Sequence, residues 1–356
     1  MSQEVIQNSS NAVAIDPVKA KLIGKRKLFS LPQWAVAWIV LIPALIFIIL
    51  FMLYPIINTF LFAFVQDFTY VPGAGSFALG QYIADMDVTQ QATFGFQNFV
   101  TAMENEYFIH SIRNTAELVI IEVPLTIIIS LLIATFLNSI KVLKGFYQTV
   151  FFLPYVTNSI ALGLVFNIVF QSGSGGLMNI FLTKVFGLNP VNWLAEVPTM
   201  ASRFHQGVVI VTYSIWNGIA FKILVFMSGL ATIDKQYYDA AKIDGASSFT
   251  IWRRITIPLL SPQILYITIT SFIGSFKMYT GVMAVYQGVT NSAYYFGPSS
   301  KYSQSEWIPV VGWIYRELKY NTLGPGVASA ASLILLGIIM VITAVQFAVS
   351  KTRVHY

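Results

Sequence analysis

The sequence contains no cysteine and few charged residues, and each shortage narrows the class of protein. Without cysteine, disulfide bonds, thiolate metal sites and thiol catalysis are excluded. Charged residues make up 10% of the 356 residues, whereas soluble domains carry about 25%. Because so few charges do not cover a water-facing surface, the composition excludes an ordinary soluble protein.

Residues that mark catalytic and metal sites are also scarce. The three histidines, His110, His205 and His355, are isolated, so their spacing predicts no metal site. The sequence has no glycine-rich loop that ends in Gly-Lys-Ser or Gly-Lys-Thr, so we do not expect the chain to hydrolyse ATP. The sequence also shows no nucleophile–base constellation, which argues against an embedded enzyme.

Long apolar runs are what the sequence has in abundance, and 56% of its residues are hydrophobic. The runs reach about 20 residues, which is the length a helix needs to cross the hydrocarbon of a bilayer. Backbone groups in lipid must be bonded within the segment, which favours helices. We therefore predict an all-α integral membrane protein with six transmembrane helices, at 34–60, 115–137, 148–170, 208–230, 260–286 and 326–349.

Lysine and arginine are divided unevenly between the two sides of these spans. Thirteen lie in the N-terminal segment, the second and fourth connections and the C-terminal tail, and six lie in the other connections. Since cytoplasmic loops are enriched in these residues, we expect both termini in the cytoplasm. We attribute the net charge of +6 to contact with anionic membrane lipid rather than nucleic acid, because no basic stripe is interleaved with exposed aromatics.

This topology divides the chain into two expected parts. A polar cytoplasmic N-terminal segment occupies 1–33, and one transmembrane domain occupies 34–356. The domain would have an extended external loop at 66–114, a cytoplasmic loop at 231–259 and a second external loop at 287–325.

The loop 231–259 carries the most informative pattern. Asp234 and Ser247 can each cap the start of a short helix, and Gly245 can end the first helix in the left-handed conformation. Pro258 is expected to limit the second helix. From these residues alone the loop is either an amphipathic segment at the lipid headgroups, which is the commoner case, or a helix pair that docks into a partner.

The order of residues in this loop resembles the EAA loop of permease subunits in binding-protein-dependent ABC importers. The family pattern is Glu-Ala-Ala, two residues, Asp-Gly-Ala, and then a spaced Ile and Leu-Pro. Its counterparts here are Asp239, Ala240, Ala241, Asp244, Gly245, Ala246, Ile255, Ile257 and Pro258. Asp239 replaces Glu and Ile257 replaces Leu, so the charge and the apolar character are kept.

Most of the chain after residue 30 resembles sugar permeases of the maltose-system type, as at 95–99, 151–155 and 326–330. The resemblance implies the type I ABC importer permease fold in a bacterial or archaeal cell (inner) membrane. It implies that the chain forms part of a path for a carbohydrate, in particular an oligosaccharide, which an extracellular or periplasmic solute-binding protein delivers.

The resemblance also implies partners and a coupling site. A second permease subunit would complete the path, and two ATPase subunits would hold ATP and Mg, so that this chain itself binds no cofactor. The coupling residues, which would contact an ATPase subunit, are Asp239, Ala240, Ala241, Asp244, Gly245, Ala246, Ile255 and Pro258.

Polar residues inside the predicted spans are candidates for the substrate path, because such residues are costly in lipid. Lys222 and Lys277 either line the path or serve as structural ion-pair partners, while Glu122 is interpreted as structural. Side chains that could stack on a sugar or bond its hydroxyls complete the set, although aromatics in spans more often serve packing: Asn158, Tyr213, Trp216, Asn217, Tyr266 and Tyr279.

Three alternatives stay open at this point. An ion-coupled secondary transporter is typically built from inverted repeats and broken helices, and the sequence indicates neither. An ABC importer permease for a non-sugar substrate would share the loop pattern. A membrane scaffold without transport activity would share the spans.

Overall fold

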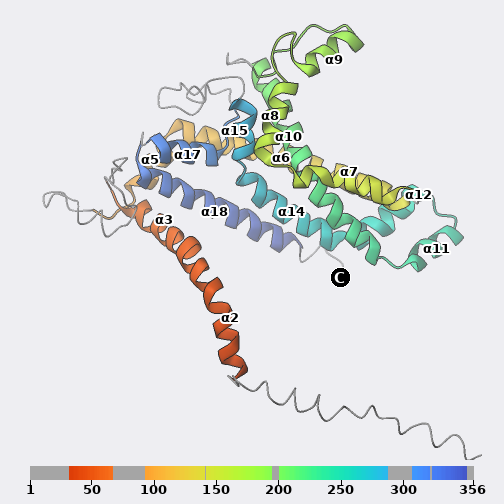
Figure 1. Ribbon diagram of the computed structural model, residues 1–356, viewed down its shortest axis with the longest axis horizontal. Helices are drawn as coiled ribbons and strands as arrows, with labels where there is room; N and C mark the ends of the chain where they lie inside the picture. The colour runs from red at the N-terminus through yellow and green to blue at the C-terminus, as the bar shows by residue number, and fades with distance from the viewer. Residues whose placement is uncertain are drawn as a thin grey trace, which may run out of the picture. The chain divides into compact units, whose positions relative to one another are not determined.

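In the part of the chain that it describes, the computed structural model of the protein is built of helices (Figure 1). By its internal contacts the chain divides into two units, 1–57 and 58–356. Val65 and Phe94 form an isolated antiparallel bridge. The structure describes residues 32–66, 93–140, 142–194, 200–287, 307–320 and 323–350.

The first unit contains the apolar helical stretch that corresponds to the first predicted span. It comprises α2 (Gln33–Ile48), the π-helical turn η1 (Ile49–Leu53) and the start of α3 (Tyr54–Phe64). The whole stretch is long and apolar enough to cross a membrane. Its helix ends at Phe64 rather than at the predicted residue 60.

Three further long helices, all in the second unit, match predicted spans. They are α6 (Glu106–Ser139), α10 (Met200–Thr232) and α18 (Pro325–Ser350). The helix α6 begins before the second predicted span, 115–137. It begins at Glu106 because Asn105 caps it, with a side-chain oxygen that accepts a hydrogen bond from the Phe108 amide at 3.0 Å.

The third predicted span, 148–170, is not one helix. It consists of α7 (Lys144–Val156) and α8 (Ser159–Val169), which are bent by 97°. The side-chain oxygen of Asn158 accepts a hydrogen bond from the Ile160 amide at 2.8 Å and so begins a new helix. The prediction of an unbroken span here was wrong.

The fifth predicted span, 260–286, is divided as well. It contains α14 (Ser261–Phe276) and α15 (Thr280–Gln287), with residues 277–279 between them. The expectation that the chain has no broken helices is therefore wrong. By length and composition, four helices of the described residues can cross a membrane. The number rises to as many as six if each of two strongly bent helix pairs forms a single span. One pair is α7 with α8, and the other is α14 with the helix 248–259 that precedes it.

Shorter helices lie in the connections. Figure 1 shows α9 (Leu177–Phe186) and α11 (Lys235–Ile243) near opposite ends of α10. The predicted loops 66–114 and 287–325 are partly helical, since they contain α5 (Gln97–Glu104), the start of α6, and α17 (Val310–Tyr320). The remaining parts of these loops, 67–92, 288–306 and 321–322, and the N-terminal segment 1–31 lie outside the described residues.

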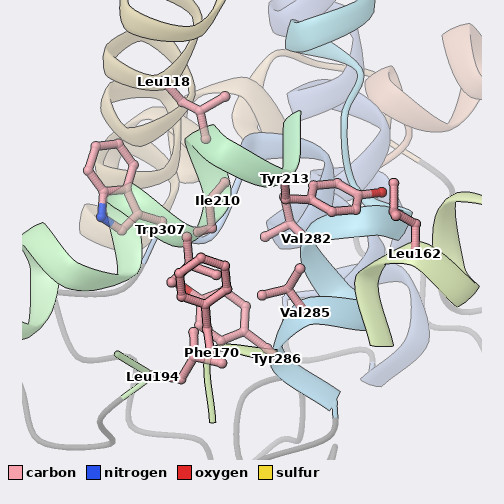
Figure 2. Packing of buried hydrophobic residues seen from close by; sticks show 11 residues of the cluster. Leu118, Leu162, Phe170, Leu194, Ile210, Tyr213, Val282, Val285, Tyr286 and Trp307 are labelled. Atoms are coloured by element: carbon pink, nitrogen blue, oxygen red, sulfur yellow. The ribbon is translucent and has the colours of Figure 1, made fainter. Parts of the chain in front are cut away.

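A buried cluster joins α8, α10 and α15 (Figure 2). Tyr213 of α10 lies beside Leu162 of α8 and Val282 of α15, and its hydroxyl donates a hydrogen bond to the Ser159 carbonyl at 3.0 Å. α8 and α15 approach closely at Gly163, where an added Cβ would lie 2.6 Å from the Ala284 methyl. The helices that follow the two breaks are therefore packed against each other.

An ion-pair cluster joins the first halves of α6 and α10. The Arg203 guanidinium contacts Glu117 Oε2 at 2.6 Å and donates to Asn114 Oδ1 at 3.0 Å. It also stacks 4.4 Å from the ring centroid of Trp307, whose indole N–H donates to the Arg203 carbonyl at 2.7 Å. Arg113 Nε lies 2.8 Å from Oε1, the other carboxylate oxygen of Glu117. The cluster ties the segment at 307 to both helices.

Candidate functional site

The loop 231–259 forms the predicted pair of short helices. Asp234 Oδ1 accepts a hydrogen bond from the Gln236 amide at 3.0 Å and caps α11. Gly245 has φ +72°, the left-handed conformation expected where the first helix ends. Ser247 Oγ accepts from the Thr250 amide at 3.3 Å and caps the second helix. The two predicted caps and the glycine turn are confirmed.

The second helix of the loop ends beside the proline that was expected to limit it. It runs through α12 (Ser248–Ile251), the π-helical turn η2 (Trp252–Thr256) and α13 (Ile257–Leu259). Pro258 occupies the first turn of α13 and the helix ends one residue later. A proline lacks the N–H that would continue the helix, which fits its position one residue before the end, where the chain bends by 66° into α14 (Ser261–Phe276).

The first helix of this loop offers an accessible surface of small and acidic side chains. None of the residues of α11 is buried. Asp239 and Lys242 form a loose ion pair of 3.7 Å in which both side chains are about 70% exposed, so the pair contributes little to stability. Of the predicted coupling residues, Asp239, Ala240, Asp244 and Gly245 are exposed, whereas Ala241, Ala246, Ile255 and Pro258 are half-buried.

Two hydrogen bonds connect the helices of this loop to each other and to the bundle. The Tyr238 hydroxyl on α11 and the Thr256 hydroxyl on η2 lie 3.3 Å apart. The Trp252 indole N–H donates to Thr135 Oγ1 of α6 at 3.2 Å. These two hydrogen bonds form a continuous connection from α11 through the second helix to α6.

A cavity of about 480 Å³ lies between α6, α10, α14 and the two helix breaks. Ser159 lines it at the start of α8, and Lys277 and Thr280 line it at the break before α15. Unpaired backbone groups in a membrane protein are tolerated only inside protein or beside a water-filled space. The position of both breaks at one cavity satisfies that condition.

The structure brings together five of the eight residues predicted for the substrate path. The five that line the cavity are Tyr213, Asn217, Lys222, Lys277 and Tyr279. The other three lie elsewhere. Asn158 caps α8, while Trp216 and Tyr266 are 52% and 50% exposed and do not line the cavity.

Glu122 of α6 lies in the cavity wall and is held by two hydroxyl groups. Ser275 Oγ donates to Glu122 Oε2 at 2.5 Å, and Thr126 Oγ1 donates to Oε1 at 3.1 Å. Lys222 of α10 lines the same cavity, and its ammonium group donates to the Gly218 carbonyl at 3.4 Å. Lys222 and Glu122 are 7% and 3% exposed.

The family of the chain follows from a comparison with known proteins. The model of the binding-protein-dependent transport system inner membrane component matches residues 126–354. The chain belongs to this family. It is therefore a multi-pass membrane component of a transport system rather than the ATPase of one.

Similar proteins and structures agree with this family. The arabinooligosaccharides transport system permease protein AraP of Bacillus subtilis is 30% identical over 337 residues, which cover 94% of each chain. The lactose transport system permease protein LacF of Rhizobium radiobacter is 29% identical, over 72% of this chain and 78% of the relative. A bacterial ABC transporter involved in the import of the acidic polysaccharide alginate contains a chain of similar fold, with TM-score 0.70 and 18% identity over 95% of this chain and 99% of that one.

The broken helices, which the sequence analysis associated with ion-coupled secondary transporters, thus occur here in a binding-protein-dependent permease. Sequence reasoning also missed several small polar residues that line the cavity. A signal was present in α14, where Thr270 and Gly274, and Ser271 and Ser275, recur at a spacing of four in an apolar helix. The further lining residues that were not predicted as substrate contacts are Glu122, Tyr155, Ser159, Ser214, Gly218, Phe221, Met278, Thr280 and Gly281.

Proposed function

We propose that the protein is a channel-forming subunit of an ATP-driven importer that carries an oligosaccharide into a bacterial or archaeal cell. The observation that carries the proposal is the loop 231–259, called the coupling loop from here on. Its first helix is exposed, and its second helix is hydrogen-bonded to α6 through Trp252 and Thr135. A surface helix joined to a membrane helix in this way suits the transmission of force from a partner.

The proposed assembly contains this chain, a second permease subunit, two ATPase subunits that bind ATP and Mg, and an external solute-binding protein. Both termini and the coupling loop face the cytoplasm, as the distribution of lysine and arginine favours. Asp239, Ala240, Ala241, Asp244, Gly245 and Ala246 contact an ATPase subunit. When the ATPase subunits close, the coupling loop moves as a rigid helix pair and changes the side from which the cavity is accessible.

The proposed substrate class rests on the relatives and on the cavity together. The two relatives named above are transport system permeases for arabinooligosaccharides and lactose. In this chain, Tyr155 and Tyr279 contribute aromatic rings to the cavity lining, and Asn217 offers an amide. Such a mixture of aromatic surface and a few polar groups suits a sugar, which stacks on rings and exchanges hydrogen bonds through its hydroxyls.

A bulky substitution at the end of α11 tests the coupling role. Gly245 has positive φ, and a Cβ placed there would meet no atom within 4 Å, so Gly245→Trp fits the isolated chain apart from backbone strain. We expect this variant to insert normally but to lose co-purification of the ATPase subunits and sugar uptake.

Gly187 supplies a matched control for that variant. It also has positive φ, it ends the short helix α9, and it has no atom within 4 Å of an added Cβ. Gly187→Trp thus imposes the same backbone strain at a site distant from the coupling loop. Normal ATPase binding by Gly245→Trp, or equal loss of binding by both variants, would contradict the proposed role.

A further inference from the structure

The charges that line the cavity are not balanced, and their excess suggests what kind of sugar the proposed importer carries. This inference depends on the proposed function, because it concerns the substrate of the same cavity. Three ionisable side chains of Asp, Glu, Lys or Arg line it, namely Glu122, Lys222 and Lys277. A second cavity of the chain, of about 500 Å³, has no such charged residue in its lining. Of these two cavities, only the first is lined by charged side chains.

Two of the three charges, one acidic and one basic, are withdrawn into the cavity wall. The side chains of Glu122 and Lys222 are almost fully buried. Both oxygens of Glu122 already accept hydrogen bonds, from Ser275 and Thr126. The formal charges of Glu122 and Lys222 are opposite in sign and cancel in the sum, and burial of both side chains leaves little of either charge for a substrate.

Lys277 accounts for the excess of positive over negative charge in the cavity lining. It lies at the break between α14 and α15, its side chain is exposed, and it belongs to the cavity lining. Within the described ranges of the chain no ion pair includes it, and Glu122 is the only acidic residue of those ranges that lines the cavity. The cavity of this chain therefore has one net positive charge.

A cation inside a membrane domain is costly and marks a functional position by default. In a cleft with low-dielectric walls, such a charge raises the local concentration of anions and steers them inward. We propose that the transported sugar carries an anionic group, a carboxylate or a phosphate, and that the Lys277 ammonium is its partner during passage. The tyrosines of the cavity then hold the sugar ring while Lys277 selects for the charge.

The test compares sugars with and without an anionic group, taken up by cells that contain the complete importer. The probes are trigalacturonate, its fully methyl-esterified form and cellobiose 6-phosphate, so that the arms separate a carboxylate from a phosphate. We expect Lys277→Gln to lower uptake of the preferred anionic probe about tenfold, which is the effect of one charge-assisted hydrogen bond. Lys277→Arg should retain most of it, and the methyl ester should be unaffected by either variant.

Lys184→Gln on α9 is the matched control, because it removes an exposed lysine that does not line the cavity. Equal loss of charged and neutral sugars in Lys277→Gln would assign the residue to assembly, for example to a carboxylate of the second permease, and would overturn the inference. Uptake of the neutral ester alone by the wild type would also overturn it, while the proposed sugar import would stand. If no probe entered or stimulated ATP hydrolysis, the inference would be overturned, whereas the proposed function is tested separately by ATPase binding to Gly245→Trp.

Discussion

The indole nitrogen of Trp252 and the hydroxyl of Thr135 are joined by a hydrogen bond of 3.2 Å, which connects the coupling loop to α6. Thr135 lies on the same helix, α6, as Glu122 of the cavity wall. Helix geometry places these two residues roughly 20 Å apart along one continuous helix. A single helix thus connects the coupling loop to the cavity wall.

Removal of this bond is expected to uncouple ATP hydrolysis from transport. Trp252→Phe retains an aromatic ring against α6 but loses the N–H donor, so the fold should survive at a cost of about 1 kcal/mol. We expect sugar uptake per ATP hydrolysed to fall several-fold in reconstituted vesicles. Phe249→Leu, an exposed aromatic on the same loop, is the control.

Thr135 provides the second half of this experiment. If the bond is the relevant link, Thr135→Val should reproduce the uncoupling, and the double variant should be no worse than either single variant. Additive losses would show that Trp252 and Thr135 act separately, and the proposed route through α6 would have to be abandoned.

The ion-pair cluster on Glu117 predicts unequal roles for its two arginines. Arg203 is 18% exposed at its side chain and also bonds Asn114 and stacks on Trp307, whereas Arg113 is 74% exposed. Arg203→Gln should therefore cost about 2 kcal/mol, and Arg113→Gln less than about 0.5 kcal/mol.

Thermal unfolding of the two arginine variants in detergent measures this difference. The variants share the substitution and the same acidic partner, so that only burial and additional contacts distinguish them. Equal melting temperatures would mean that the cluster does not tie α10 to α6.

Local signals in the sequence predicted those features that depend on neighbouring residues. Asp234, Gly245 and Ser247 act on amides or backbone angles within a few residues, and each has the predicted role. The spans that became α6, α10 and α18 were recognisable because hydropathy over about 20 residues is a local quantity as well.

The helix breaks and the composition of the cavity depend on contacts that a single sequence does not reveal. Hydropathy does not change where a helix changes direction, so the 97° bend before Asn158 leaves the apolar run intact. Trp216 and Asn217 are adjacent in sequence, yet only Asn217 lines the cavity, because successive residues of a helix face different directions. Which side of α10 meets α14 is a property of the packed bundle.

The close contact between α10 and α15 predicts a strong effect of a single methyl group. A Cβ at Gly281 would overlap the phenol ring of Tyr213, whose hydroxyl is bonded to the Ser159 carbonyl. Gly281→Ala should therefore destabilise the protein by about 2 kcal/mol, as overpacking does. Thermal unfolding in detergent measures the loss, and sugar uptake should decrease with it.

Gly337 of α18 is the control for this contact. An added Cβ there would have no atom within 4 Å, so Gly337→Ala should be neutral or slightly stabilising, as is usual inside a helix. A melting temperature of Gly281→Ala equal to that of Gly337→Ala would contradict the close packing of Tyr213 on α15.

The hydrogen bond from Ser275 to Glu122 joins α14 to α6 just before the second helix break, and its loss should destabilise both helices. Ser275→Ala removes one of the two hydroxyl donors to a carboxylate that is 3% exposed, at a cost of about 2 kcal/mol for an unsatisfied buried group. Ser271→Ala, one turn earlier on α14, removes a hydroxyl from the cavity without touching that bond and should change stability little.

Thermal unfolding of the double variant separates the bond from its surroundings. With Glu122→Gln already present, the buried charge is gone, and the additional cost of Ser275→Ala should fall below about 1 kcal/mol because less desolvation is left uncompensated. A cost that is the same in both backgrounds would mean that Ser275 stabilises α14 independently of Glu122. In that case the bond would not be what holds the cavity wall in place beside the break.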